Sequence, residues 1–490
     1  MKALLFNLSF LVAGYWLFTA CTETIPDFQL NAEYPSIYPD YVNVTIPYNI
    51  SPLNFMLKKK CEKVEVLISS KKRQLRLRAG YKIQIPLSDW KQLLNEQKGD
   101  SIIVTVTAKF NGKWIRFKPF AWHITDDAID PYLTYRLIEP SYEVWNKLSI
   151  CQRNLENYDE QVIVDNNLAE GACLNCHVFC NQDPKVSFFH LRGQHGGTFI
   201  NRDGKIRKLN TKTDQTISSL IYGNWHPGGK FIAFSTNILV PAYHSMDRRL
   251  EVYDKKSDVV VLDVDKNEIF TSDLLSSSSA FETFPAFSAD GRKLYFCTAP
   301  ALAMPENYKS IRYSLCSIDF FADTHSFGKH VDTLVSAAAT GKTASEPKVS
   351  PDGKYLLYTS FDYGNFPLWH READLYLINL ATQKTDTLPK VNADYADSYH
   401  SWSSNSRWFV FASKRDNGMY GKPYFAYIDK DGKTFKPFVL PQKDPEFYDY
   451  TLLSFNIPEL SKGPVPFDAY DIQQIYSKEK PEKVKFMGAF

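Results

Sequence analysis

The chain has 490 residues, a formal net charge of +2, 44% hydrophobic residues and 15% aromatic residues. This composition is typical of globular domains, and the near-neutral charge argues against nucleic acid as a partner. The 29 Tyr and 34 Phe far outnumber the 6 Met, which favours β-structure. The length allows two or three domains.

The N-terminus predicts an export signal over residues 1–20. A basic start is followed by a short apolar stretch, Ala3 to Phe18, below the roughly 20 residues that a membrane-spanning helix needs. The sequence Phe18-Thr19-Ala20-Cys21 resembles a bacterial lipobox. The resemblance implies cleavage before Cys21 and lipid attachment to it, hence a protein anchored in the cell envelope, at the outer membrane or facing the periplasm. An ordinary signal peptide is the alternative.

Short alternating segments predict a small β-sandwich of immunoglobulin-like type over residues 41–126. The polar residues 21–40 predict a linker before it. Residues 127–186 lose the alternation and predict a connecting segment with a helix at 141–154. Within the sandwich the expected strands are 42–46, 64–68, 82–85 and 101–108, with a helix at 87–94.

Residues 187–490 repeat one unit, which consists of a tight turn, a basic residue and a strand. Four copies are anchored at Gly229, Gly291, Gly353 and Ser406, with spacings of 291 − 229 = 62, 353 − 291 = 62 and 406 − 353 = 53. A hairpin at 187–209 precedes them, and a closing strand at 452–460 follows. Five recognisable units predict six blades after closure. The expected fold is therefore all-β, an immunoglobulin-like sandwich followed by a six-bladed β-propeller.

The unit Ser350-Pro351-Asp352-Gly353-Lys354 resembles the WD40-like repeat of TolB-like six-bladed propellers, over about residues 187–460. The resemblance implies the fold but no single function, because such propellers serve as binding platforms, enzyme scaffolds and partners in envelope complexes. The order of lipobox, β-rich domain, CxxCH motif and propeller also resembles bacterial lipoproteins labelled cytochrome c-like. An envelope protein partner, and membrane contact through the lipid anchor, are expected.

The motif that carries chemistry is Cys173-Leu174-Asn175-Cys176-His177. Its spacing lets both thiols add to the vinyl groups of haem c while His177 ligates the iron, and export supplies the required compartment. Two other interpretations stay open. Cys173 and Cys176 can form a disulfide, or they can bind zinc together with Cys180 and a histidine.

A second iron ligand is expected nearby. His190 and His195 follow His177 by 190 − 177 = 13 and 195 − 177 = 18 residues, and otherwise read as a packed strand residue and a turn residue. His244 and Met246 are more distant options. Arg192 either pairs with a haem propionate or is a solvated residue.

These features favour a c-type haem-binding protein for electron transfer or sensing, with the propeller as a docking platform. The alternative is a non-haem propeller that binds a peptide, glycan or protein partner, with CxxCH as a zinc or disulfide staple. The absence of HExxH and GxSxG gives no support for an enzyme. The lack of a helical domain around Cys173 weakens the haem interpretation.

Overall fold

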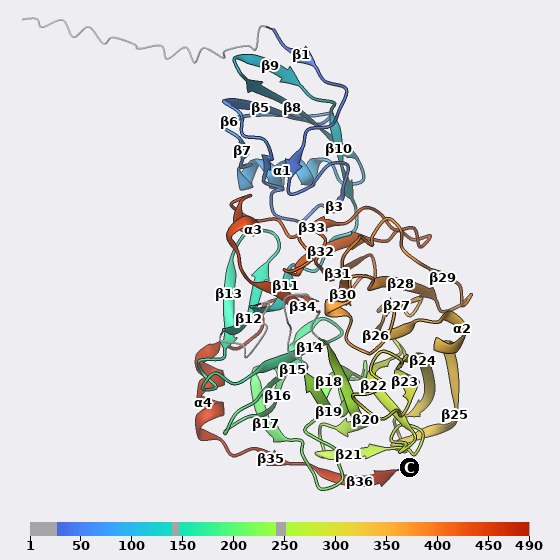
Figure 1. The fold of residues 1–490 in the computed structure, drawn as a ribbon. Coiled ribbons are helices and arrows are strands. Elements are labelled where there is room, and N and C mark those ends of the chain that lie inside the picture. The colour runs from blue at the N-terminus through green and yellow to red at the C-terminus, as the bar shows by residue number, and fades with distance from the viewer. Residues whose placement is uncertain (1–26, 140–146, 242–250, 490) are drawn as a thin grey trace, which may run out of the picture.

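The computed structural model describes residues 27–139, 147–241 and 251–489. Within these ranges the chain is all-β, and a small N-terminal domain stands at the edge of a large ring of sheets (Figure 1). None of the helices in the described part is long and apolar enough to cross a bilayer. These helices are α1 (Leu87–Glu96), α2 (Ala337–Thr340), α3 (Phe447–Tyr450) and α4 (Ala469–Lys478), with a 3-10 turn, η1 (Pro367–Trp369).

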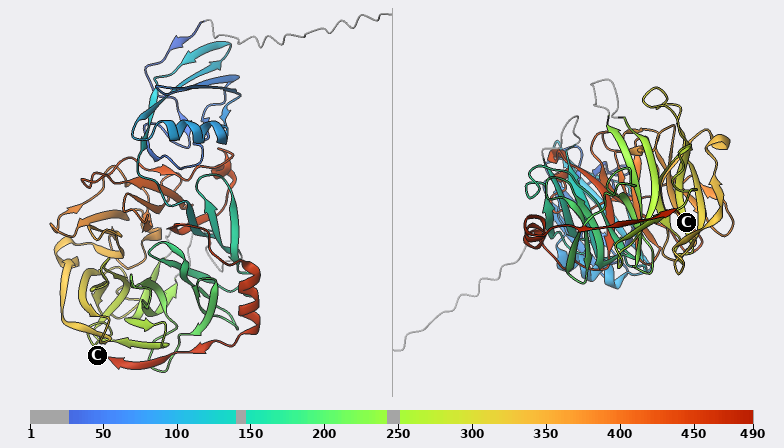
Figure 2. Two further views of the ribbon diagram at one scale, coloured as in Figure 1. Left: turned by 180° about the vertical axis from the view of Figure 1, so that it is seen from behind. Right: turned by 90° about the horizontal axis from the view of Figure 1, so that it is seen from below.

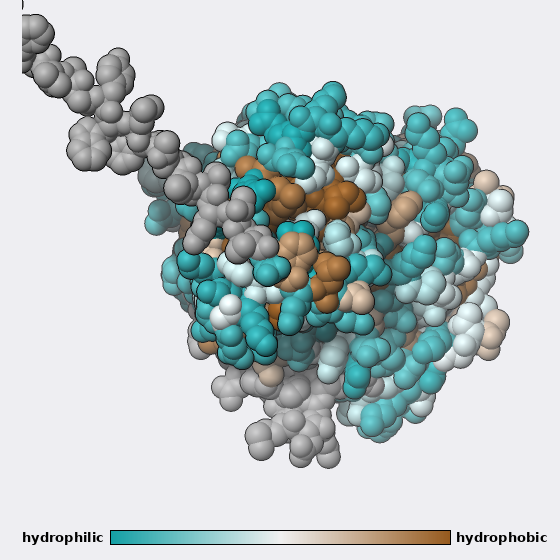
Figure 3. Space-filling view, turned by 90° about the horizontal axis from the view of Figure 1, so that it is seen from above, coloured by the Kyte–Doolittle hydropathy of each residue, from teal (hydrophilic) through white to brown (hydrophobic). Residues whose placement is uncertain are grey.

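Two sheets and α1 form the N-terminal domain, in which Trp90 of α1 and Trp122 are fully buried with ring centroids 5.4 Å apart. The outer end of the domain is mostly hydrophilic, with hydrophobic side chains gathered in a few places (Figure 3). The larger sheet consists of β1 (Gln29–Leu30), β3 (Thr45–Pro47), β5 (Lys63–Ser69), β6 (Gln74–Ala79), β8 (Ser101–Phe110), β9 (Lys113–Arg116) and β10 (Phe120–Thr125), and the smaller one of β2 (Ile37–Tyr38), β4 (Phe55–Leu57) and β7 (Lys82–Ile83).

The expected strands at 64–68 and 101–108 and the expected helix at 87–94 are present as β5, β8 and α1. The linker expected at 21–40 is wrong in part, because β1 and β2 pair with strands of the two sheets. Such two-residue strands are too short to give an alternating pattern. Cys21 lies outside the described residues.

Six four-stranded antiparallel sheets form the ring. The innermost strands β14, β18, β22, β26 and β30 each contact the next, and β34 contacts both β30 and β14, so the ring closes. This is a propeller-like arrangement, which leaves no inner sheet edge unpaired. In ring order the sheets are β34 (Ser454–Ser461), β11 (Tyr132–Ile138), β12 (Leu148–Asn154) and β13 (Glu160–Asp165); β14 (Leu174–Cys180), β15 (Asp183–Leu191), β16 (Gly197–Arg202) and β17 (Lys205–Asn210); β18 (Ile221–Trp225), β19 (Phe231–Pro241), β20 (Val252–Asp263) and β21 (Glu268–Thr271); β22 (Ala280–Phe287), β23 (Lys293–Pro300), β24 (Ser314–Phe321) and β25 (Ser326–Val335); β26 (Thr343–Val349), β27 (Tyr355–Phe361), β28 (Asp374–Asn379) and β29 (Thr385–Asp386); and β30 (Asp397–Trp402), β31 (Trp408–Ser413), β32 (Lys422–Tyr427) and β33 (Phe438–Val439).

The repeated turns join the first and second strands of four sheets, as expected. Their anchor residues, Gly229, Gly291, Gly353 and Ser406, have φ between 61° and 72°. Glycine adopts this left-handed conformation without steric cost, whereas Ser406 adopts it at some cost. The turn chemistry therefore set the register of the repeats correctly.

The ring begins earlier in the chain than expected. The predicted connecting segment, 127–186, contains β11, β12 and β13 of one sheet and β14, the first strand of the next. The helix expected at 141–154 is wrong over its described part, where β12 forms. Residues 148–153 are all buried, so this strand shows no apolar-polar alternation.

The N-terminal domain is fixed to the sheet of β30–β33. The carboxylate of Asp130 accepts hydrogen bonds from the backbone N–H of Ser404 (2.7 Å) and from its hydroxyl (2.6 Å). The indole of Trp408 donates to the carbonyl of Asp127 at 3.0 Å. One hydrophobic cluster runs through both bodies, so the domain and the ring share a core.

The C-terminal residues close the ring and then bind its outside. β34 pairs with β11 antiparallel, which confirms the closing strand expected at 452–460. The following segment, here called the strap, consists of α4, β35 (Glu482–Lys483) and β36 (Lys485–Ala489), and it runs along the outside of the ring (Figure 2). β35 and β36 add parallel fifth strands to β17 and β21, which covers two outer sheet edges.

Lys208 of β17 ties the strap to the ring. Its ammonium donates to the carbonyls of Ile475 (3.1 Å) and Tyr476 (3.0 Å) in the last turn of α4. We predict that Lys208→Met lowers the free energy of unfolding, measured by urea denaturation, by about 1–3 kcal/mol, because both carbonyls lose a charged donor. Lys205→Met, at an exposed position of the same strand, is the control. Equal stability of the two variants would contradict this role.

Candidate functional site at the ring axis

Each innermost strand carries a β-bulge, a shift in its register with the second strand. In five strands a non-glycine residue at the bulge has φ between 49° and 55°. Such a residue costs about 1–3 kcal/mol, and a bulge redirects the side chains around it. These bulge residues are Tyr222, Phe284, Glu346, Tyr399 and Ile457. In β14 the same interval contains Cys176 and His177.

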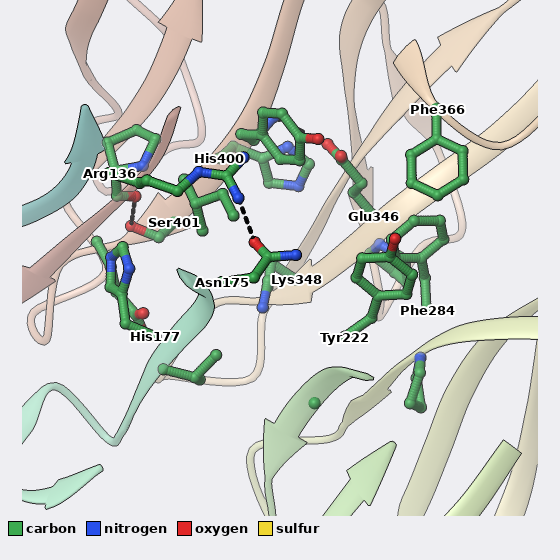
Figure 4. A pocket seen from close by; sticks show the side chains of 18 of the residues that line it. Arg136, Asn175, His177, Tyr222, Phe284, Glu346, Lys348, Phe366, His400 and Ser401 are labelled. Carbon is green, nitrogen blue, oxygen red and sulfur yellow. Dashed lines mark hydrogen bonds between the residues drawn. The ribbon is translucent and has the colours of Figure 1, made fainter. Parts of the chain in front are cut away.

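The residues that follow the bulges surround one hollow, here called the axial pocket (Figure 4). Its volume is about 390 Å³, within the range of small-ligand sites. All six sheets contribute to it through the same strand position. The residues at this position are His177, Gly223, Pro285, Pro347, His400 and Pro458.

An aromatic cluster forms one side of the axial pocket. Tyr222 and Phe284 have ring centroids 4.8 Å apart, and Phe366 lies 5.7 Å from each of them. Figure 4 shows the three rings together, away from Arg136 and His177. This side offers an apolar surface to a planar or aliphatic group.

The opposite side is polar and carries positive charge. The guanidinium of Arg136, from β11, donates to the side-chain carbonyl of Asn175 at 2.6 Å and to the backbone carbonyl of Leu174 at 3.3 Å. Lys348 of β26 also lines this side, and the hydroxyl of Ser401 donates to the carbonyl of Pro458 at 2.9 Å. Arg136 thus has neutral partners only.

Two carboxyl groups line the same pocket. Glu346 accepts a hydrogen bond from the backbone N–H of Tyr399 at 2.8 Å, and Glu459 accepts one from the N–H of Phe179 at 3.0 Å. Burial raises the pKa of each carboxyl to about 7, against the partly compensating charge of Lys348. Both groups therefore change charge near neutral pH.

His177 and His400 occupy equivalent positions in β14 and β30. The Nε2 of His177 lies 3.3 Å from the carbonyl of Thr134, and that of His400 lies 3.0 Å from the carbonyl of Leu357, each in a neighbouring sheet. Burial lowers the pKa of His177 to about 4 and that of His400 to about 3, so both are neutral at pH 7. His400 has no cysteine beside it, so the ring architecture by itself accounts for a histidine here.

The structure brings together only part of the haem site expected from the sequence. Cys173 is buried and lines the axial pocket with His177, whereas the side chain of Cys176 lies outside the description. His190 lines a different hollow, where its Nδ1 lies 2.9 Å from the hydroxyl of Thr198. His195 is exposed and packs against Tyr476. His244 and Met246 are not described.

The zinc site expected as an alternative is not formed by the described residues. Cys180 is buried at the far end of β14, where its Sγ lies 3.6 Å from the carbonyl of His226, and burial raises its pKa to about 11. Cys173 and Cys180 belong to different hydrophobic clusters. No three His, Cys, Asp or Glu side chains of the described chain are placed to hold a metal ion.

The bulge residues were missed in the sequence, although their spacing marks them. They precede the turn anchors of the repeats by 229 − 222 = 291 − 284 = 353 − 346 = 406 − 399 = 7 residues. Prolines at 285 and 347 follow two of them directly. Extending the repeat backward by seven residues locates four of the pocket-lining strands.

Neither a known family model nor a curated protein matches the chain. Among solved structures, it is similar to prolyl oligopeptidase B from Galerina marginata, with 11% identity, a TM-score of 0.35, and coverage of 80% of this chain and 54% of that one. It is also similar to a DUF4784 family protein from Bacteroides caccae, with 8% identity, a TM-score of 0.32, and coverage of 84% and 98%. Dipeptidyl peptidase 4 from Porphyromonas gingivalis gives 11%, 0.29, 63% and 52%. The chain spans about half the length of these peptidases, and likenesses this distant support no statement about activity.

The pKa of Glu346 predicts how stability depends on pH. The folded protein keeps a proton on this carboxyl up to about pH 7, whereas an ordinary glutamate loses it near 4.5, so its contribution to stability falls as pH rises through that interval. We predict that Glu346→Gln raises the free energy of unfolding by up to about 3 kcal/mol at pH 8 and changes it little at pH 4.5. Urea denaturation across pH 4.5–8 measures this. Glu33→Gln, at an exposed site, is the control, and parallel pH curves for wild type and Glu346→Gln would refute the assignment.

Proposed function

We propose that this protein is an envelope lipoprotein, anchored through Cys21, in which a six-bladed TolB-like β-propeller binds a small ligand at its axis. On this proposal the N-terminal domain is an immunoglobulin-like spacer between anchor and ring, and an envelope protein partner contacts the outer surface. The observation that carries the proposal is the convergence of one strand position from all six sheets on the axial pocket. A bulge repeated around an axis opens a cavity there while the outer strands keep their pairing.

The lining of the axial pocket favours binding over catalysis. The hydroxyl of Ser401 donates to a backbone carbonyl, and the Nε2 atoms of both histidines face backbone carbonyls, so no described hydroxyl is paired with a base there. Cys173 is buried, and its Sγ lies 3.6 Å from the carbonyl of Leu174. The pocket thus offers recognition surfaces, apolar on one side and charged on the other.

Haem c is the second candidate, because Cys173 and His177 line the same pocket. Two observations count against it. One nitrogen of the His177 ring already faces the Thr134 carbonyl and the other is buried without a partner, so neither is presented to the pocket as placed. The expected second ligands, His190 and His195, lie elsewhere.

A haem stain after denaturing electrophoresis, with a pyridine haemochrome spectrum, separates the two candidates. The protein is purified from its native envelope beside a Cys173→Ala/Cys176→Ala variant. Our first proposal predicts no covalent haem in either protein. A haem band that is present in the wild type and lost in the variant would replace ligand binding by the c-type haem function.

Filling the axial pocket tests ligand binding directly. Val252 lines this pocket, whereas Val162 is 46% exposed on the outer strand β13. We predict that fragments detected by ligand-observed NMR lose at least ten-fold in affinity in Val252→Trp and keep it in Val162→Trp. Binding that is unchanged in Val252→Trp would show that the axial pocket is not the site.

A further inference from the structure

The axial pocket carries more positive than negative charge. Arg136, Lys348 and Arg192 line it, and its carboxyl groups are Glu346 and Glu459. Neither Arg136 nor Lys348 has a carboxylate of the described residues within 4.0 Å, although ion pairs at this distance occur elsewhere in the ring, as between Arg415 and Asp397 at 3.1 Å. A guanidinium that is 8% exposed and has only neutral partners is costly to bury. An anionic ligand would supply the missing counter-charge.

The two carboxyl groups do not compensate these cations. Both are engaged by backbone N–H groups, those of Tyr399 and Phe179, and Glu346 also accepts from the hydroxyl of Thr359 at 3.4 Å. With pKa values of about 7, each is roughly half protonated at neutral pH. The pocket therefore keeps a net positive charge, which grows as pH falls.

The remaining groups around the pocket add no charge. His177 and His400 are neutral, because burial lowers their pKa values far below 7. Asn175 and Ser401 present amide and hydroxyl groups, and the aromatic cluster of Tyr222, Phe284 and Phe366 is apolar. Positive charge thus lies on one side of the pocket and the aromatic surface on the other (Figure 4).

We propose that the axial pocket binds an organic acid, with its carboxylate held by Arg136, Lys348 and Arg192 and an aromatic or branched aliphatic body against the aromatic cluster. This inference rests on the proposed function and names its ligand class. A guanidinium matches a carboxylate through two parallel hydrogen bonds, and an ammonium adds charge. A cavity of about 390 Å³ admits a body the size of one aromatic ring with a short side chain.

The same groups set the pH dependence of binding. Lowering the pH from 8 to 6 protonates Glu346 and Glu459, which removes negative charge facing the bound carboxylate. The cations and the two histidines keep their charge state over this interval. Affinity for an organic acid with a pKa below 5 therefore rises as pH falls from 8 to 6, by about three- to ten-fold.

Three probes of equal shape test the ligand class by isothermal titration calorimetry with the chain from Thr22 to Phe490, which keeps every described residue. They are 3-phenylpropionate, 3-phenylpropanol and 3-phenylpropylamine. The acid is expected to bind at least ten-fold more tightly than the alcohol and the amine. Lys348→Met removes this preference, and the exposed Lys354→Met keeps it. Arg192→Gln, at an exposed position, weakens the acid several-fold without a risk to folding.

Each outcome decides one proposal. If the alcohol or the amine binds as tightly as the acid and Val252→Trp abolishes that binding, the ligand class is wrong and the axial binding function stands. If the acid binds equally well to wild type, Lys348→Met and Arg192→Gln, the assigned cations are wrong. If none of the three probes binds at millimolar concentration, both the ligand class and the proposed binding function are overturned.

Discussion

A strand with one residue more than its partner must bend, and every innermost strand of the ring does so. Without the bulge, side chains at the ring centre would alternate between its two neighbouring sheets and fill the axis. The bulge instead directs consecutive residues toward the axis, at the cost of left-handed backbone in residues such as Glu346 and Tyr399. The pocket, its charges and its aromatic side all depend on this repeated irregularity.

The turns and outer strands of the ring were predictable, because their signals are local. Asp-Gly pairs set hairpin turns, and the strands after them are continuous apolar runs. The first sheet escaped detection for two physical reasons. Its strand β12 is buried on both faces and shows no alternation, and its innermost strand, β34, comes from the other end of the ring.

The candidate site was predicted only in part, because chemistry and architecture gave competing explanations for one residue. His177 follows Cys176 as a haem ligand would, yet it also stands at the strand position that His400 occupies six residues before a repeat turn. The positive charge at the axis was not predictable, since Arg136 and Lys348 lie 212 residues apart (348 − 136). Only ring closure brings their strands to one cavity.

That closure gives the order of synthesis a role. Glu459 enters the pocket on β34, whose partner β11 was made more than 300 residues earlier (454 − 138 = 316). A nascent chain that lacks its last few dozen residues therefore holds five sheets with exposed inner edges and no axial cavity. Contacts this distant in sequence form slowly, because the chain between them must first be confined. Ligand binding at the axis accordingly reports a completed chain, and a truncated product is both inactive and prone to edge-to-edge association.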